Sequence, residues 1–385
     1  MAKRKAEDVV VVKDTKKPSK GPGNGGRKVS VCIPSTVIGS KNAYNLEQIT
    51  HITYQIAKAC TIYDVVEIVV VDIPKVNEDE TSKVVQMSSN KGGKKLKFNF
   101  KDEEIVGSSK VETQQDNEDS KDKDNGKDDN EEGLLLAGLL QFFITPPYLV
   151  KSLFSNQKTA SILNKFKYAW KLPKITTLPF MSNNNIYRDF KEGLTIAKET
   201  PKITKKSKRV KNPHKLTVTK YVNIGESKPF ELTNIKREIP VNSRVTVDLK
   251  NKTIVSPLQA YGIQGNKSSF GYYVRYVKKF NHLFTESSNA EGYSQSIFVH
   301  CDDYFSNGVK FESLNKVPAL SESDNEGNVL IVVGNYKDYE TSFLNDKENL
   351  EGVDNVGQMF DGRLQIPDGI KIEDGILIAL TKLNL

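Results

Sequence analysis

The feature that most constrains the fold is an uninterrupted aliphatic run near the C-terminus. Residues 329–333 are all valine, leucine or isoleucine, and Gly334 follows them directly. A strand without polar alternation requires cover on both faces, as in the interior of a parallel sheet. The run therefore predicts a buried strand that ends in a tight turn.

A loop and a helix are expected after this strand. In residues 365–370, Pro367 restricts φ and Gly369 permits a positive φ. Apolar residues then recur at helical spacing, and two acids occupy the first turn, where the helix dipole favours them; these residues are Ile372, Ile376, Leu380, Leu383, Glu373 and Asp374. Loops beside strand and helix ends are where α/β folds bind ligands. From residue types alone, a plain terminal βα unit fits the same pattern.

The N-terminal part predicts a β-α-β unit. Residues 29–33 form a first strand, residues 46–63 have helical periodicity, and residues 65–72 form a second buried strand. Asn45 can cap the helix, and Gln48 can reach back to it. This succession predicts a parallel sheet with a right-handed crossover.

The rest of the expected α/β domain is scattered along the chain. The pattern predicts helices at residues 134–143 and 278–285, strands at 271–277 and 295–300, and a loop at 302–327. Thr145 is expected to cap a second short helix that begins with Pro146 and Pro147.

A stretch of short alternating strands lies within this domain. Strands are expected at residues 193–198, 216–224, 230–235, 243–249 and 253–255, which suits a small OB-like β-barrel. Eight lysines and arginines but one glutamate lie between residues 198 and 215, in an expected loop of the barrel. The candidate RNA-binding residues are Lys202, Lys205, Lys206, Lys208, Arg209 and Lys211, which would track phosphates. An ordinary solvated loop is the alternative.

Charge divides the chain unevenly. The net charge is +8, and residues 112–132 hold ten acids and three lysines, so the remainder is close to +15. A basic body favours a polyanionic partner such as nucleic acid. Residues 1–27 are expected to be a disordered basic tail, whose Lys3, Arg4 and Lys5 could serve nuclear import, and residues 75–132 a disordered charged insertion.

Several classes of protein are not supported. Cys32, Cys60 and Cys301 are far apart, and the four histidines lack zinc-binding spacing, so no metal site is expected. The longest apolar run, residues 134–144, is too short and too interrupted to span a bilayer. No signal peptide is recognised, so an intracellular chain with no membrane partner is expected.

Several motifs resemble one family. The segments KVSVCIPSTVIG, LLQFFITPPYLVKSLF, GYYVRYVKKFNHLF, EGYSQSIFV and FDGRLQIPDGIKIEDGILIALTKL are similar to successive blocks of the SPOUT-class RNA methyltransferases. The resemblance is to the eukaryotic and archaeal branch that carries an inserted barrel. It covers most of the chain outside the tail and residues 75–132.

The resemblance implies an α/β fold: a SPOUT trefoil-knot parallel sheet with an inserted OB-like β-barrel. The implied domains are a SPOUT α/β domain in three parts, residues 28–74, 133–189 and 266–385 with the knot, and a barrel at 190–265. It also implies a homodimer, or a heterodimer with a paralogous SPOUT protein. Ribosomal RNA (rRNA) as partner, large-subunit ribosome biogenesis, and a nuclear, nucleolar location are implied as well.

The implied cofactor is S-adenosyl-L-methionine (SAM), held mainly by backbone groups of loops 299–302, 333–335 and 364–370. The cofactor-binding residues carried over are Val299, His300, Val333, Gly334, Asn335, Leu364, Ile366, Pro367, Gly369 and Ile370. Asp368, Asp302 and His300 are the candidate catalytic residues for proton handling.

The loops depart from the family pattern. VHCDDY at residues 299–304 replaces Gly-Thr-Ser-Glu-Arg-Gly, Gly334-Asn335 replaces Gly-Gly, and IPDG at residues 366–369 replaces Gln-Gly-Ser-Arg. The changes remove backbone freedom and a cation. Two hypotheses follow: a SAM-dependent rRNA methyltransferase, or a diverged member with a degenerate SAM site that serves as a catalytically inactive RNA-binding scaffold and dimer partner. A small-molecule enzyme is a third, less favoured class.

Overall fold

A computed structural model describes residues 28–74, 131–154, 162–181, 188–197, 204–205, 208–209, 217–233, 235, 239–261, 271–288, 291–302, 312–319 and 327–383. The expected tail at residues 1–27 lies outside this part of the chain, as does all of the expected insertion up to residue 130. Statements about structure below refer to the described residues.

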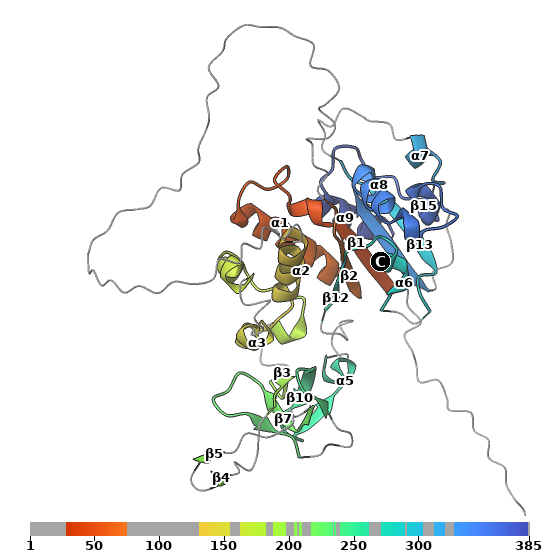
Figure 1. Ribbon diagram of the computed structural model, residues 1–385. Helices are drawn as coiled ribbons and strands as arrows, with labels where there is room; N and C mark the ends of the chain where they lie inside the picture. Colours follow the sequence, from red (N-terminus) through yellow and green to blue (C-terminus); the bar gives the residue numbers. More distant parts are fainter. Residues whose placement is uncertain are drawn as a thin grey trace, which may run out of the picture. The chain divides into compact units, whose positions relative to one another are not determined.

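A six-stranded sheet, in which every pairing is parallel, forms the α/β part of the chain (Figure 1). Across the sheet the strands are β12 (Tyr273–Val277), β2 (Glu67–Val71), β1 (Lys28–Pro34), β14 (Asn328–Gly334), β13 (Gln295–His300) and β15 (Gly362–Arg363). The predicted parallel sheet is confirmed. The strand β14, which contains the aliphatic run, lies between β1 and β13, in the interior of the sheet.

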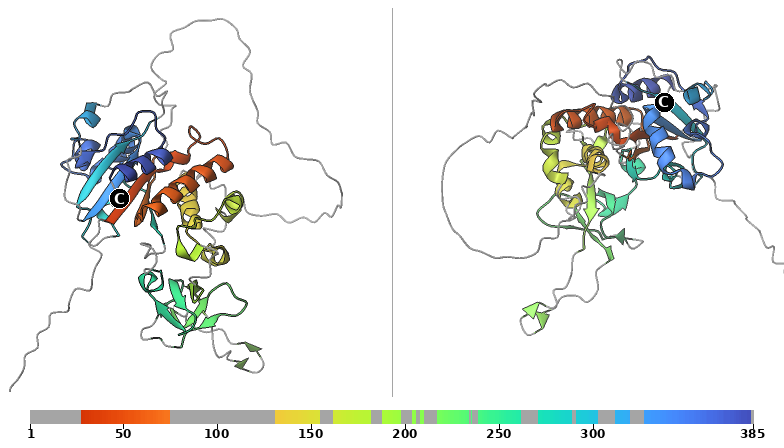
Figure 2. Two further views of the ribbon diagram at one scale, coloured as in Figure 1. Left: turned by 180° about the vertical axis from the view of Figure 1, so that it is seen from behind. Right: turned by 45° about the horizontal axis from the view of Figure 1, so that its top comes forward.

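Both faces of the sheet are covered. Along β14, Ile331 packs into one hydrophobic cluster and Val332 into another, and both are fully buried. The first cluster includes side chains of α1 (Leu46–Ile62), α2 (Glu131–Phe143) and α9 (Ile372–Lys382). The second includes side chains of α6 (His282–Thr285), α7 (Glu312–Asn315) and α8 (Tyr336–Asn345). Figure 2 shows α1 and α9 side by side, as their packing requires. The continuous apolar character of β14 follows from this two-sided burial.

The cap of α1 forms much as expected. The Asn45 side chain accepts a hydrogen bond from the Gln48 amide at 2.9 Å. Gln48 reaches back one residue farther than predicted, because its Oε1 accepts from the amide of Tyr44 at 2.7 Å. Both bonds satisfy amide groups that the helix itself leaves unbonded.

Other local expectations were wrong. Thr145 does not cap α3 (Pro147–Leu153), because its hydroxyl donates to the Gln141 carbonyl of the preceding helix at 2.6 Å. The helix expected at residues 278–285 is reduced to α6, and the expected loop at 302–327 contains the short helix α7. The pattern predicted no helix at residues 336–345, where the structure has α8, which buries Tyr336, Tyr339 and Phe343.

The middle of the chain forms a separate antiparallel sheet of five strands. In spatial order they are β11 (Thr253–Val255), β10 (Arg244–Asp248), β3 (Phe190–Thr195), β7 (Tyr221–Asn223) and β8 (Phe230–Glu231). Just beyond β8, the Thr233 amide donates to the Lys252 carbonyl beside β11 at 3.2 Å. This bond links the two edges of the sheet at one point. The pairs β4 (Thr204–Lys205) with β5 (Lys208–Arg209) and β6 (Val218–Thr219) with β9 (Ile239–Pro240), together with α5 (Pro257–Tyr261), complete the region.

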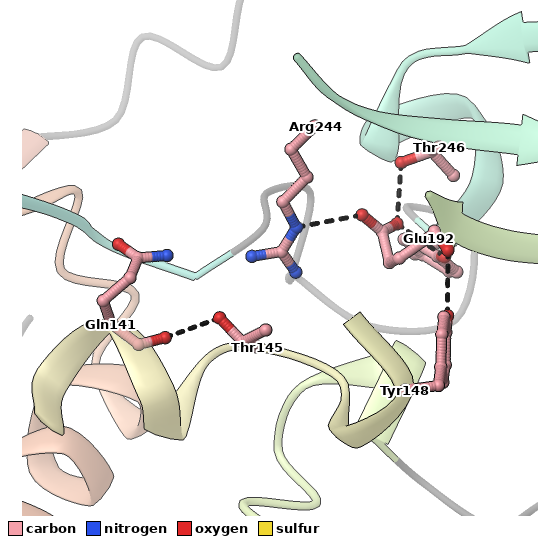
Figure 3. A network of polar contacts seen from close by, with 7 residues as sticks. Gln141, Thr145, Tyr148, Glu192, Arg244 and Thr246 are labelled. Carbon is pink, nitrogen blue, oxygen red and sulfur yellow. Dashed lines mark hydrogen bonds and ion pairs between the residues drawn. The ribbon is translucent and has the colours of Figure 1, made fainter. Parts of the chain in front are cut away.

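A buried polar network joins α3 to this second sheet (Figure 3). Glu192 on β3 is fully buried, and its carboxylate accepts from Thr246 at 2.8 Å and from Tyr261 at 2.9 Å. It also meets the Arg244 guanidinium at 3.4 Å, while the Tyr148 hydroxyl of α3 donates to the Glu192 carbonyl at 2.9 Å. Burial raises the pKa of Glu192 and lowers the pKa of Arg244, and for both groups it outweighs their mutual attraction. The network is therefore stable only as a complete set of partners.

Removal of one partner should be costly. We expect Glu192→Ala to lower the free energy of unfolding by about 3–5 kcal/mol, because the Arg244 charge would stay buried without its carboxylate. Urea unfolding measures the loss. The control is Lys250→Ala, which removes the exposed ion pair with Asp189 and should cost under about 1 kcal/mol. An equal loss of unfolding free energy in Glu192→Ala and Lys250→Ala would contradict the role given to the buried Glu192–Arg244 pair.

Candidate functional site

The site is built where β13 and β14 end side by side. Their parallel register pairs His300 with Gly334, and the Cys301 amide continues the pairing by donating to the Gly334 carbonyl at 3.0 Å. The next residues of both strands therefore meet, and the side-chain Nδ2 of Asn335 donates to the Asp302 carboxylate at 3.0 Å. Two of the three expected loops are thus in direct contact.

The start of α8 orients His300. Asn335 caps this helix by accepting from the Lys337 amide at 2.9 Å. The backbone amide of Tyr336, the first residue of the helix, donates to Nδ1 of His300 at 3.4 Å. In a neutral imidazole an accepting Nδ1 leaves the proton on Nε2. His300 is thereby prepared to donate a hydrogen bond from Nε2.

The surroundings keep His300 neutral. Burial lowers the pKa of His300, and the nearby Arg363 cation acts in the same direction. The carboxylates of Asp302 and Asp368 oppose this shift without reversing it. All three candidate catalytic residues are therefore electrostatically coupled at one site. Arg363 was missed in the sequence, where the arginine appeared to be lost; its position beside the expected loop was the available signal.

The third expected loop runs from β15 to α9. Its first residue, Leu364, donates its amide to the Phe298 carbonyl of β13 at 2.9 Å. Ile366 is buried, Pro367 and Asp368 are exposed, and Gly369 has the expected positive φ of 74°. Residues 368 and 369 form a turn in this loop. The backbone of this loop is the part that the family resemblance expects to face the cofactor.

The helix α9 lies directly against the end of β13. A Cβ atom on Gly375 would come within 2.3 Å of the Cys301 sulfur, so only glycine permits this approach. Burial, followed by the charges of Glu373, Asp302 and Asp374, raises the pKa of Cys301 to about 12. Cys301 is therefore a neutral packing residue and no nucleophile.

The expected cofactor residues fall into three groups. Val299 and Val333 are fully buried in the hydrophobic core, so only their backbone groups could face a ligand. Leu364 and Ile370 pack partly against the same core. The remaining residues, at positions 300, 334, 335, 366, 367 and 369, lie at the strand ends or in the loop after β15.

The expected basic loop is partly a hairpin. Lys205 pairs with Lys208, and Thr204 with Arg209, in the β4–β5 strands. The prediction of a loop was wrong at these positions. Lys202, Lys206 and Lys211 lie outside the described residues. In the described part of the chain, no group of three or more metal-ligating side chains occurs, and no helix is long and apolar enough to cross a membrane.

The family of the chain follows from comparison with known proteins. A family model described as "Putative RNA methyltransferase" matches residues 28–383. The chain belongs to this RNA methyltransferase family. The match includes both sheets and the three loops of the site.

Relatives extend over nearly the whole chain. Two Saccharomyces cerevisiae proteins are named "Putative methyltransferase YMR310C" and "Putative methyltransferase YGR283C". The first is 29% identical and covers 93% of this chain and 94% of the relative; the second is 30% identical and covers 92% and 87%. A Drosophila melanogaster "28S rRNA (uridine-N(3))-methyltransferase" is 24% identical over 99% of this chain and 65% of its own length.

The site residues fit a methyl-donating sulfonium cofactor in general chemical terms. Backbone groups of the loop at residues 366–370 would offer partners for a purine ring. The acids Asp302 and Asp368 favour a nearby cation, and Arg363 offers a partner for a carboxylate.

The charges around His300 can be tested by titration. We expect its imidazole to titrate below the ordinary value of about 6.5. Asp302→Asn should lower the pKa of His300 further, and Arg363→Gln should raise it. NMR of isotope-labelled histidine measures the shifts. Asp354→Asn, at an exposed position, is the control and should change nothing.

The same shift predicts a pH-dependent stability. The folded pKa of His300 is the lower one, so the unfolded chain takes up the proton first as the pH falls below about 6.5. Stability should decline between that pH and the folded pKa, and His300→Gln should remove this part of the decline. An unchanged decline in the variant would contradict the buried, neutral histidine.

Proposed function

We propose that this chain is a SAM-dependent RNA methyltransferase of the SPOUT class that acts on rRNA. The observation that carries the proposal is the meeting of His300, Asp302 and Asn335 at the ends of β13 and β14. Membership of an RNA methyltransferase family supports the reaction class. SAM, when bound, would supply an electrophilic methyl group to a nucleophilic atom of the RNA.

The cofactor would be held mainly by the backbone of residues 366–370. Arg363 would face its carboxylate, and Asp302 and Asp368 would lie on the side of the sulfonium. The altered loop would thus keep a cation at the site from a neighbouring strand, in place of the arginine that the family carries within the loop.

The relative from Drosophila suggests N3 of uridine as the first acceptor to test. This atom carries a proton, which must leave when the methyl group is attached. His300 would donate from Nε2 to a neighbouring base carbonyl, where negative charge develops. Asp302, oriented by Asn335, would accept the proton, and Asp368 is the second candidate for this role.

The finer architecture belongs to the same proposal. The exclusively parallel sheet with β14 between β1 and β13 supports a C-terminal trefoil knot, and the Thr233–Lys252 bond supports an OB-like barrel. The boundaries proposed for the barrel are residues 190–265. Dimerisation, a nucleolar location and a role in large-subunit ribosome biogenesis complete the proposal.

Calorimetry tests the cofactor, and a methylation assay tests the chemistry. The full chain should bind SAM, and no heat of binding at millimolar SAM would contradict the enzyme. Asp302→Asn should reduce methylation of an rRNA fragment by about 10²–10⁴-fold with unchanged RNA affinity, because proton transfer contributes that much. Asp354→Asn is the control at an exposed position. Loss of activity in Asp368→Asn alone would assign the proton acceptor to Asp368.

A second function is favoured by a specific observation, the replacement of Gln-Gly-Ser-Arg by residues 366–369. An inactive scaffold would bind RNA and a paralogous subunit without SAM. RNA binding with no response to SAM, and no methylation of any rRNA fragment, would support this function over the enzyme.

The hairpin β4–β5 supports an RNA contact in either case. We expect the triple variant Lys205→Gln, Lys208→Gln and Arg209→Gln to weaken binding of an rRNA fragment. It should reduce the slope of log K against log salt by about 0.7 for each lost phosphate contact with single-stranded RNA. The control is Lys220→Gln, since this exposed lysine already pairs with Glu231. An unchanged affinity and slope in the triple variant would contradict the contact.

A further inference from the structure

A second basic segment lies outside the site and the β4–β5 hairpin. Between Glu132 and Asp189 the sequence has seven lysines and arginines and no acidic residue. The described part of this segment includes two short 3₁₀ helices, η3 (Asn164–Lys167) and η4 (Ala169–Lys171).

The three-residue period of these helices divides their side chains between a buried face and an exposed face. Residues three apart share a face in a 3₁₀ helix. Phe166 and Ala169 are buried in the main hydrophobic cluster. Lys167, Trp170 and Lys171 are exposed, and Trp170 keeps 46% of its surface open to solvent. An exposed tryptophan is therefore displayed between lysines.

The two aromatic rings of this surface are held in place. The ring of Trp170 meets Phe142 of α2 edge-on, with centroids 4.9 Å apart and planes at 83°. The ammonium groups of Lys167 and Lys171 lie 4.9 and 5.2 Å from the centroid of the Tyr168 ring. Little side-chain freedom would thus be lost when a ligand stacks on these rings.

The charge of the surface is not neutralised locally. Lys165 pairs with Glu131. Within the described residues, no ion pair is recorded for Lys167, Lys171 or the exposed Lys174. The surface combines one exposed tryptophan with three exposed lysines that form no ion pair among the described residues.

We propose that this surface, named the Trp170 surface and made of Lys167, Tyr168, Trp170, Lys171 and Lys174, binds an unpaired stretch of the RNA substrate. Bases stack on exposed aromatic rings, while lysines neutralise the flanking phosphates. The inference rests on the proposed RNA substrate, and it adds a contact at residues separate from those of the methyl-transfer site. Binding here would give the RNA a second point of attachment on the protein.

The test uses the fluorescence of Trp170, which is the only tryptophan in the chain. A single-stranded oligouridylate of about 12 nucleotides, within the range of such sites, should quench the emission of the full chain. Trp170→Ala should weaken binding at least about fivefold, measured by anisotropy of labelled RNA, since stacking on one base contributes at least that factor. Trp170→Phe keeps an aromatic ring and should retain most of the affinity.

The contribution of the lysines is measured by the salt dependence of RNA binding. Lys167→Gln, Lys171→Gln and Lys174→Gln together should reduce the salt slope by about 2, at 0.7 for each contact. Lys347→Gln, which removes one charge from an exposed position in η6 (Lys347–Asn349), should leave affinity and slope unchanged.

These measurements test RNA binding at the Trp170 surface separately from the proposed methyl transfer. Quenching by RNA without any methylation would uphold the Trp170 surface and count against the proposed reaction. Binding of RNA that is insensitive to Trp170→Ala would overturn the surface and leave the reaction standing. Equal quenching by polyglutamate of matched charge would also overturn the proposal, since it would indicate an acidic protein partner instead.

Discussion

The parallel pairing of β14 with its neighbours is the constraint on which the rest of the structure depends. The strand is buried on both faces and has a partner on each side, β1 from the N-terminus and β13 from the preceding segment. Because alternate side chains of the strand pack into two different clusters, a shift in this pairing would misplace side chains in both. The same register places His300 beside Gly334, so the stability of the core and the geometry of the site have one origin.

The site uses few side chains because most positions near it are committed to packing. Val299, Val333 and Cys301 are buried in the core, and Gly375 allows α9 to approach the sulfur of Cys301. The candidates for ligand contact are the charged group around His300 and the exposed residues Pro367 and Asp368 in the loop after β15. Such a site suits a reaction in which positioning and electrostatics matter more than a strong nucleophile.

The two surfaces proposed to bind RNA belong to different parts of the structure. The β4–β5 hairpin is a local pair of strands with basic side chains, whereas the Trp170 surface is fixed through Phe142 and Phe166 to the main core. The first provides charge, and the second adds rings on which bases can stack. Both agree with the basic balance of the chain outside residues 112–132.

The sequence was sufficient for the parallel sheet and the buried strand at residues 329–333, because hydrophobic periodicity and chain order are local properties. The loops of the candidate site came from the family resemblance. It also placed His300, Asp302 and Asp368 among the candidates. Tertiary structure alone brought Arg363 to His300, recruited Thr145 to the preceding helix, and revealed α8, which the pattern did not predict. These outcomes depend on contacts between residues that lie far apart in the chain. The spacing of residues along the sequence does not determine such contacts.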